Sequence, residues 1–381
     1  MTAFFTSPSI AWGPGAVEQL SSLGSRRALV LVDPVVARQD GHRRVLEELE
    51  KAGTVVEVVS DTKAPDEIVS AVGLRDRLRT FDPDWVVAIG GGRTVDLAKA
   101  ARAVFERPDL DLGAPPAVLG LPETPRSRLV AIPTTSGSGA EVSWTSDLFS
   151  SAGDPVELAD RALVPHWALV DAAFALSLPP TEVVSGALEA AALATEAFLS
   201  AWANPFSDAL ALHAVSTIVH RLPHAVRWSD DPDARSLLHY AATSAGLAAS
   251  NAQRGLAHAL ARALVRPTAL PYGRLLGIVL PHVLEFDRPA ARERLEALAA
   301  ATAPPDDSTR PAFAVRLRRL YDGLGVPATL VAAGIPAERV RTDRDRIVTN
   351  VLRSPAALAN PRVPNVDDVR GLLDAILGRP G

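Results

Sequence analysis

The sequence contains no cysteine, which excludes disulfides, thiolate metal sites and cysteine nucleophiles. Lysine occurs only at Lys51, Lys63 and Lys99, although arginine is abundant. No basic run or basic–aromatic stripe is present and the net charge is a mild −5, so nothing indicates a nucleic-acid surface. The first six residues lack the pattern of a signal peptide, and no apolar run approaches the roughly 20 residues that span a bilayer. We therefore expect a soluble, cytoplasmic protein.

The first half of the chain has the pattern of an α/β domain. Short apolar runs alternate with helical patterns, which indicates βαβ units and a parallel sheet. We predict strands at residues 27–33, 55–59, 85–89, 129–133 and 167–171. A proline-rich stretch at residues 113–126 is interpreted as a surface loop.

The second half has the pattern of a helical domain. After the proline-containing stretch at 178–182 the sequence becomes rich in alanine and leucine, with few strand signals. Apolar periodicity predicts helices within 185–200, 207–221 and 234–266. We place the boundary near residue 180, which gives an α/β dinucleotide-binding domain at 1–180 and an all-α domain for substrate and catalysis at 181–381. A chain of 381 residues is long enough for two such cores.

Two motifs follow predicted strands in the first half. The first is Gly90-Gly91-Gly92-Arg93-Thr94-Val95-Asp96-Leu97-Ala98-Lys99, and the second is Ile132-Pro133-Thr134-Thr135-Ser136-Gly137-Ser138-Gly139-Ala140-Glu141-Val142. Glycines that open a helix after a strand suit a diphosphate, because the backbone N–H groups face the anion and no Cβ is in the way. A tight strand–helix turn explains a glycine triplet equally well, so the two motifs are considered together.

Together these motifs resemble the iron-containing (group III) alcohol dehydrogenase family, whose members contain approximately GGGSxxDxAK and PTTxGTGSEV. The resemblance covers essentially the whole chain and extends to Asn360-Pro361-Arg362 near its end. It implies an α/β dinucleotide-binding domain followed by an all-α domain (a dehydroquinate synthase-like fold), with the active site in the cleft between them. It also implies an NAD(P)-dependent oxidoreductase with a small-molecule substrate. A homodimer is possible, because members of the family often form dimers or larger oligomers.

The resemblance assigns cofactor contacts to residues of both motifs. These are Gly90, Gly91, Gly92, Thr94, Asp96, Lys99, Thr134, Thr135 and Ser138. Arg93 replaces the usual serine and either adds a phosphate contact or crowds the diphosphate. Asp33 ends a predicted strand where a carboxylate accepts hydrogen bonds from the adenosine ribose and repels a 2′-phosphate, which favours NAD(H) over NADP(H). The alternative for Asp33 is a helix N-cap.

Family members hold one divalent metal with an Asp and three His, and the matching positions here are Glu189, Leu193, His258 and Tyr272. Glu189 and His258 offer an oxygen and a nitrogen. Leu193 offers no donor, and a phenol such as that of Tyr272, with a pKa near ~10, is a poor neutral ligand. Because catalytic metals normally have three protein ligands, we expect the metal to be absent and these positions to be vestigial.

Without a metal, other donors must stabilise the substrate oxygen as hydride arrives. His258 and Arg262 lie four residues apart on a predicted helix and therefore on one face. We propose as candidates that Tyr272 or His258 donates the proton and that Arg262 polarises the carbonyl or binds a substrate anion. The alternative for His258 is a hydrogen-bonded core histidine. Arg254, Arg266 and Arg274 are near in sequence, and we interpret the last two as solvated surface.

Three functions remain open. The first is a metal-independent reductase that transfers hydride from NAD(P)H to a carbonyl, conjugated or imine bond of a small anionic or polar molecule, in a specialised biosynthetic or catabolic step. Maleylacetate reductases of the same superfamily are a precedent for metal loss, but their His-rich motif is not reproduced here. The second is a lyase resembling the sugar phosphate cyclases, which use a Glu and two His. The third is a non-catalytic relic of the fold.

Overall fold

The computed structural model describes residues 6–39, 41–60, 66–116, 118–304 and 311–378. The chain divides into two compact units, Met1–Leu178 and Pro179–Gly381. The first is an α/β unit and the second is helical, which confirms the predicted fold class. Within the described residues, none of the helices has both the length and the hydropathy that crossing a bilayer requires.

The first unit is built on a six-stranded parallel sheet with the strand order β1-β8-β5-β4-β2-β3. Its strands are β1 (Ser9–Trp12), β2 (Arg27–Val32), β3 (Val55–Ser60), β4 (Trp85–Gly90), β5 (Arg128–Pro133) and β8 (Trp167–Val170). All five predicted strands are present, with small differences at their ends. The sequence analysis did not predict β1 or the antiparallel pair β6 (Thr145–Phe149) and β7 (Pro155–Ala159), because these short segments mix polar and apolar residues.

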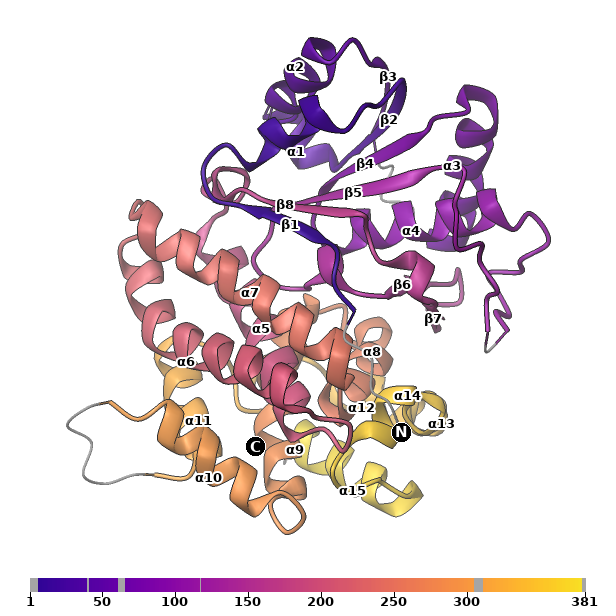
Figure 1. Ribbon diagram of the computed structural model, residues 1–381. Coiled ribbons are helices and arrows are strands. Elements are labelled where there is room, and N and C mark those ends of the chain that lie inside the picture. The colour runs from indigo at the N-terminus through magenta and orange to yellow at the C-terminus, as the bar shows by residue number, and fades with distance from the viewer. Residues whose placement is uncertain (1–5, 40, 61–65, 117, 305–310, 379–381) are drawn as a thin grey trace. The chain divides into compact units, whose positions relative to one another are not determined.

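Helices cover both faces of this sheet. They are α1 (Pro34–Arg38), α2 (Arg43–Lys51), α3 (Glu67–Phe81) and α4 (Gly92–Glu106), with 3-10 turns at Ala16–Ser22, Ala140–Val142, Arg161–Leu163 and Ala172–Phe174. Leu29 and Leu31 of β2 pack with α3 and α4, whereas Val30 and Val32 pack with α2 on the other face. Successive side chains of a strand point to opposite faces, so a sheet covered on both sides gives continuous apolar runs. Figure 1 shows α2 and α4 on opposite sides of the sheet.

The parallel strands bring the predicted cofactor residues to one edge of the sheet. β2, β4 and β5 are neighbours, and their carboxyl ends are Val32, Gly90 and Pro133. Ligands of open α/β sheets bind outside the carboxyl ends of the strands. Asp33, the glycine motif and the Thr/Ser/Gly motif each follow one of these ends.

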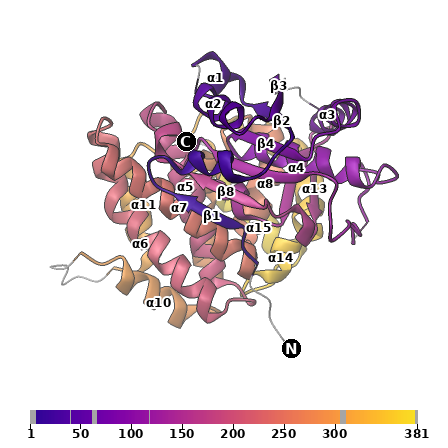
Figure 2. The ribbon, with the colours of Figure 1, turned by 45° about the horizontal axis from the view of Figure 1, so that its top comes forward.

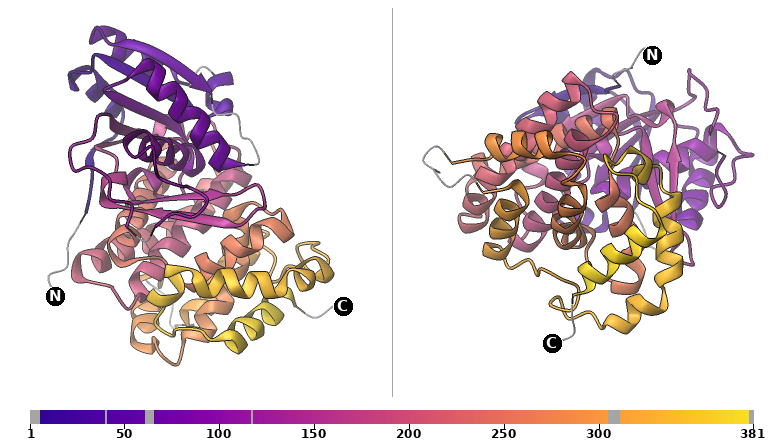
Figure 3. Two further views of the ribbon diagram at one scale, coloured as in Figure 1. Left: turned by 90° about the vertical axis from the view of Figure 1, so that its right-hand side faces the viewer. Right: turned by 90° about the horizontal axis from the view of Figure 1, so that it is seen from below.

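The second unit consists of helices. They are α5 (Pro180–Leu199), α6 (Pro205–Arg227), α7 (Pro232–Ala252), α8 (Leu256–Thr268), α9 (Tyr272–Asp287), α10 (Arg292–Ala301), α11 (Phe313–Gly323), α12 (Ala337–Thr342), α13 (Arg344–Arg353), α14 (Pro355–Ala359) and α15 (Val366–Leu377). The long helices α5, α6 and α7 pack on one another, and Figure 2 shows α6 beside α7. The C-terminal helices α13 and α15, yellow in Figure 3, pack on α8 and α9 respectively.

The helical stretch predicted at 234–266 is interrupted in the structure. Helix α7 ends at Ala252, and Gln253 then adopts φ 72°, a left-handed backbone angle rare for residues with a side chain. Gly255 follows as the N-cap of α8 in an extended conformation. A continuous helix through these residues was therefore the wrong prediction. The break allows α8 to start a new direction, which places His258 in its first turn.

Candidate functional site

The turn between β4 and α4 has the geometry of an anion site. The strand ends at Gly90 and the helix begins at Gly92, with Gly91 as its N-cap residue. No side chain caps this helix end, and its first turn contains no acidic residue. Backbone N–H groups and the helix dipole favour an anion at such an end. The local structure therefore has what the predicted contact with a diphosphate requires.

Neighbouring side chains approach the backbone of the three glycines closely, and at Gly90 and Gly92 they leave no room for a Cβ. A Cβ on Gly90 would lie 2.6 Å from the Thr94 side chain, and one on Gly92 would lie 2.6 Å from Ser138 Oγ. A Cβ on Gly91 would lie 3.2 Å from Thr135 Cγ2. The two sequence motifs therefore touch in the folded unit.

The backbone joins the two motifs as well. The Thr134 N–H donates to the Gly90 carbonyl at 3.0 Å, next to the paired strands β4 and β5. The structure thus gathers into one place residues that are more than 40 positions apart in the chain, from Gly90 to Thr134. The predicted contacts of these residues with a cofactor stay predictions.

Lys99 lies inside the first unit, and its ammonium group is fully occupied by protein oxygens. Nζ donates to Ser143 O, Ser143 Oγ and Thr145 O, each at 2.8 Å, and Asp96 lies 3.8 Å away. A lysine has three N–H donors, so these acceptors use all of them. Burial lowers the pKa of Lys99 to about 8. We interpret Lys99 as a residue that holds α4 to the segment after the second motif, and its predicted contact with a cofactor stays a prediction.

Arg93 is held by an acidic residue at the start of the neighbouring helix. Its Nε donates to Glu67 Oε1 at 2.6 Å, and Glu67 Oε2 accepts from the Phe149 N–H at 2.8 Å. Glu67 is therefore a bridge between α4, its own helix α3 and strand β6. This ion pair draws the guanidinium toward α3 and compensates for its charge.

Asp33 caps a helix, as the alternative interpretation expected. Its Oδ1 accepts from the Val35 N–H at 2.7 Å at the start of α1, and its own N–H donates to the Ile89 carbonyl at 2.8 Å. The second bond ties the end of β2 to β4, beside the glycine motif. The half-buried carboxylate therefore lies at the sheet edge where a ribose contact was predicted, and that contact stays a prediction.

The helical unit contains the four positions that match the family's metal ligands. Glu189 and Leu193 lie one turn apart on α5, His258 lies on α8, and Tyr272 is the first residue of α9. A Cβ on Gly273 would lie 1.9 Å from the backbone oxygen of Ser185, so the start of α9 packs directly on α5. The His258 and Tyr272 rings meet edge to face with centroids 6.0 Å apart.

These four positions do not fit a divalent metal. Leu193 is 3% exposed and offers only carbon atoms. In the described residues no group of three or more His, Asp, Glu or Cys side chains is arranged to hold a metal ion. A catalytic metal normally needs three protein ligands, so a site with two good donors is chemically inadequate.

A carboxylate that the sequence analysis missed holds His258. Glu196 on α5 accepts a hydrogen bond from His258 Nδ1 through Oε2, and from the Ala257 N–H at 2.5 Å through Oε1. Glu196 is 4% exposed and His258 is 2% exposed. A single acid among the buried residues of an apolar helix is a signal for a paired carboxylate, since glutamate is almost never buried without a partner.

A second polar residue supports the same end of α8. Asn360 Oδ1 accepts from the Leu256 N–H at 3.1 Å, and its Nδ2 donates to Asp287 Oδ1 at 2.6 Å. Burial raises the pKa of Asp287 to about 8, so this carboxyl group is mainly protonated at neutral pH. Two side chains from distant parts of the unit therefore cap α8, whose own N-cap residue, Gly255, has no side chain to do so.

The other two predicted catalytic residues lie on α8 and at the start of α9. Arg262 follows His258 by one turn of α8 and is 7% exposed, and Tyr272 is half-buried at the start of α9. Arg254 and Arg274 are partly buried, and Arg266 is exposed, as expected for solvated surface. The helical unit therefore brings His258 and Tyr272 together and places Arg262 one turn away.

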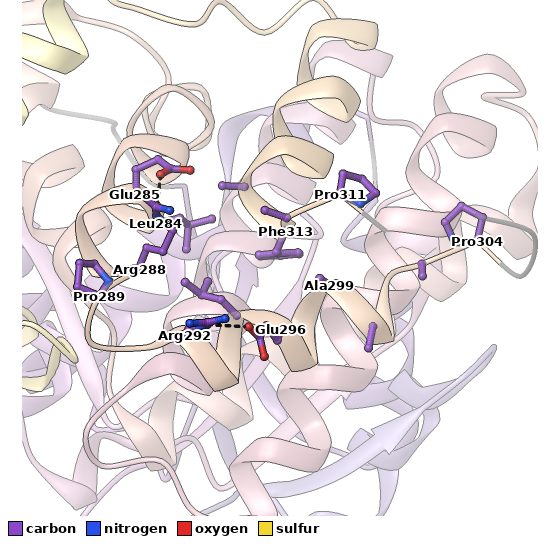
Figure 4. A pocket seen from close by; sticks show the side chains of 15 residues that line it. Leu284, Glu285, Arg288, Pro289, Arg292, Glu296, Ala299, Pro304, Pro311 and Phe313 are labelled. Carbon is purple, nitrogen blue, oxygen red and sulfur yellow. Dashed lines mark hydrogen bonds and ion pairs between the residues drawn. The ribbon is translucent and has the colours of Figure 1, made fainter. Parts of the chain in front are cut away.

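A large pocket elsewhere in the helical unit contains none of the predicted site residues. It lies between the end of α9, α10 and the start of α11, with a charged rim that includes Arg288, Arg292 and Glu296 (Figure 4). Arg292 Nε donates to Glu296 Oε1 at 3.0 Å, so part of the rim is already paired. We do not assign the predicted chemistry to this pocket.

Comparisons with known proteins agree along the whole chain. A family model described as iron-containing alcohol dehydrogenase matches residues 7–172, and one described as Fe-containing alcohol dehydrogenase family, C-terminal, matches residues 183–377. The NADPH-dependent butanol dehydrogenase of Clostridium saccharobutylicum is 27% identical, over 98% of this chain and 97% of its own. The bifunctional aldehyde-alcohol dehydrogenase AdhE of Escherichia coli K12 is 29% identical over 96% of this chain, which spans 45% of that longer protein.

A solved structure gives the same result for the fold. The iron-containing alcohol dehydrogenase of Thermococcus thioreducens has a TM-score of 0.88 at 27% identity, with 98% of each chain covered. Both units of the present chain, and the order in which they occur, are therefore found in a protein of that type.

Proposed function

The chain belongs to the iron-containing alcohol dehydrogenase family, and we propose that it acts as a reductase that has lost the metal. As a member of this family it is an NAD(P)-dependent oxidoreductase for a small molecule. Within that class we propose hydride transfer to a carbonyl, conjugated or imine bond of an anionic or polar substrate.

The donor set around His258 carries the proposal. Leu193 has no ligand atom and the Tyr272 phenol is a poor neutral ligand, so only Glu189 and His258 offer good donors. A metal in this family supplies Lewis-acid stabilisation of the oxygen that gains charge during reduction. In its absence that stabilisation must come from hydrogen-bond donors and cations aimed at the same oxygen.

Three side chains of the helical unit have this chemistry. His258 has a second ring nitrogen, Nε2. Tyr272 has a hydroxyl group, and its ring lies against the His258 ring. Arg262, one turn along α8, carries a buried guanidinium. We propose that His258 or Tyr272 supplies the proton to the substrate oxygen. Arg262 then polarises the carbonyl or binds an anionic group of the substrate, which is the reason to expect a polar or anionic substrate.

For the cofactor we propose NADH rather than NADPH. A carboxylate at the end of β2 repels a 2′-phosphate and accepts hydrogen bonds from ribose hydroxyls, and Asp33 occupies that position. The butanol dehydrogenase relative is NADPH-dependent, so the preference of this chain has to be measured on the chain itself.

The decisive experiment measures NADH oxidation by protein dialysed against EDTA. The substrate panel contains aldehydes, keto acids and unsaturated acids, each assayed with and without added Fe(II) or Zn(II), and the metal content of the dialysed protein is determined separately. We expect turnover that survives dialysis and does not rise with metal. Turnover that appears only after metal is restored would overturn the proposal, because Glu189 and His258 would then still anchor an ion.

A further inference from the structure

Glu196 is placed to control the chemistry of His258. We propose that Glu196 is a positioning residue for the reduction: it fixes the His258 ring so that Nδ1 faces the carboxylate and Nε2 serves the substrate. This inference rests on the proposed function for its catalytic consequence. Its structural basis is the pair of bonds from His258 Nδ1 and the Ala257 N–H to the two oxygens of one buried carboxylate.

Capping of α8 does not by itself require a carboxylate. Asn360 caps the adjacent Leu256 N–H with a neutral amide oxygen, so an uncharged side chain is sufficient for this work. Burying a carboxylate is costly unless it is paired and hydrogen-bonded. Glu196 is 4% exposed and makes its second bond to an imidazole, so the charge is placed where it acts on His258.

The two bonds together remove the rotational freedom of the imidazole. His258 is the third residue of α8, and Glu196 holds both the backbone before it and its own ring. Gly255 makes this approach possible, because a Cβ there would lie 2.8 Å from Glu196 Oε1 and 3.0 Å from Asn360 Oδ1. The carboxylate, the helix start and the ring therefore form one rigid arrangement.

A carboxylate at Nδ1 determines which nitrogen is available. A neutral imidazole has one N–H and one lone pair, and the bond to an acceptor at Nδ1 places the N–H there. When both nitrogens carry hydrogen, the positive charge is compensated by Glu196 and the Nε2–H is the donor. Arrangements of this type, in which a carboxylate orients an imidazole, are a general feature of sites where histidine transfers protons.

The resulting step balances for a carbonyl substrate. Bound NADH would supply hydride to the carbonyl carbon and would be oxidised to NAD⁺. The π electrons of the C=O bond move to oxygen, which takes the proton from His258 Nε2, and the product is an alcohol. His258 is left neutral with its Nδ1–H still bonded to Glu196, and solvent returns the proton.

The kinetic test compares Glu196→Gln with two matched controls. A Gln offers one acceptor oxygen, so it can keep the Ala257 cap only by turning its amide N–H group toward Nδ1, which must then carry the lone pair. Glu182→Gln makes the same change at an exposed position of the same helix, and Asn360→Ala removes the other α8 cap without contact to His258. We expect Glu196→Gln to lower kcat roughly tenfold to a hundredfold, as for a lost hydrogen bond to a charged group, with the KM for NADH changed less than about twofold.

The controls separate positioning from stability. Glu182→Gln should keep wild-type kcat, and Asn360→Ala should lower Tm at least as far as Glu196→Gln does while losing less than about threefold in kcat. Equal losses of kcat in Asn360→Ala and Glu196→Gln would overturn the proposal, because Glu196 would then act only through the cap of α8.

A spectroscopic test needs no substrate. In protein labelled with ¹⁵N-histidine, two-bond ¹⁵N–¹H correlation spectra distinguish the two ring nitrogens, and the His258→Ala spectrum identifies the His258 signals among the eight histidines. We expect a proton on Nδ1 of His258 in the wild type and a changed pattern in Glu196→Gln. A lone pair on Nδ1, or an unchanged spectrum in the variant, would overturn the positioning role. If the wild type shows the expected pattern but reduces nothing in the panel, the proposed function fails while the assigned ring orientation stands.

Discussion

Gly92→Ala tests the contact between the two motifs of the predicted cofactor site. An alanine Cβ would lie 2.6 Å from Ser138 Oγ and 2.7 Å from Ser138 Cβ, far inside normal contact. Because Cβ is bonded directly to the main chain, the clash must move one of the two loops. Overpacking of this kind costs about 1–3 kcal/mol. In a unit of this size ~1 kcal/mol lowers Tm by about 2–4 °C, so we expect a fall of about 2–12 °C.

The same displacement should weaken cofactor binding. The first N–H groups of α4 are aimed by the Gly90–Gly92 turn, and loss of one hydrogen bond to a charged phosphate is worth about 1.5–3 kcal/mol. We therefore expect the Kd for NADH to rise tenfold or more, measured by fluorescence titration. A variant that melts and binds NADH like the wild type would refute the assignment of this turn to the cofactor.

Two further variants make the result specific. Gly73→Ala introduces the same methyl group into α3, where nothing lies within 4 Å of the added Cβ. Alanine is the better helix former by roughly 0.5–1 kcal/mol, so this control should be stabilised and bind NADH normally. Adding Ser138→Gly to Gly92→Ala removes both clashing atoms and should recover part of the Tm and affinity. A double variant no better than the single one would show that the contact is not the cause.

Four other predictions address the rest of the chain. Tyr272→Phe and His258→Ala should each lower kcat by about 10²–10⁴-fold with little change in NADH affinity, and full activity in both would remove them as proton donors. Asp33→Ala should narrow the NADH-over-NADPH ratio of kcat/KM by about tenfold, the value of one lost charge-assisted bond, and an unchanged ratio would remove Asp33 from the ribose site. Burial lowers the pKa of His239 from 6.5 to about 4, so the unfolded chain takes up this proton at a higher pH than the folded protein. The free energy of unfolding is therefore highest above pH 6.5 and decreases as the pH falls toward 4. Denaturant titrations of the wild type should show that the free energy of unfolding falls by about 1–2 kcal/mol between pH 6.5 and 5, and that it falls less in His239→Gln. The same pH dependence in both proteins would contradict this. Leu193→His combined with Tyr272→His should rebuild a four-donor site that retains Fe(II) or Zn(II) through dialysis, and failure to retain metal would mean that the backbone of the site has changed as well.

The α/β half was predictable because its signals are local. A strand buried on both faces gives an uninterrupted apolar run, and β2, β4 and β5 are such strands. The glycine triplet follows one of these runs directly, so the start of α4 could be placed from sequence. The contact between Gly92 and Ser138 could not, because it depends on the neighbouring positions of β4 and β5 in the sheet.

The helical half hid its chemistry for two physical reasons. Glu196 and His258 are 62 residues apart, and helical periodicity gives no information on which distant helices meet. The residue with positive φ at the break is Gln253, which is neither a proline nor a glycine, so neither residue type marked the end of α7. The 234–266 segment was therefore predicted as helical throughout. One sequence signal was available. Glu182, Glu189 and Glu196 recur every seven residues on α5, two turns apart, and the last of them lies where the helix has no exposed face.

Lys99 shows how a motif residue can have a structural role that its place in the motif did not suggest. A lysine within a glycine motif suggests a cofactor contact, since an ammonium group in solvent is free to reach an anion. Here the side chain is fully buried, and three oxygens of the segment 143–145 receive its N–H groups. The motif spacing places the lysine on the inner face of α4, and only the fold shows that the second motif lies against that face.

The buried polar groups argue against a non-catalytic relic. Replacing buried ionic groups by apolar residues of similar volume is often neutral or stabilising, so a fold kept only as a scaffold has no physical need for them. This chain nevertheless buries Glu196, His258 and Arg262 within two helices, while Leu193 already shows that an apolar residue is accommodated at this site. The buried groups present here are able to transfer a proton or to carry charge, and Leu193 stands where the family pattern has a metal ligand. That distribution is what we expect where the metal is lost and reduction is kept.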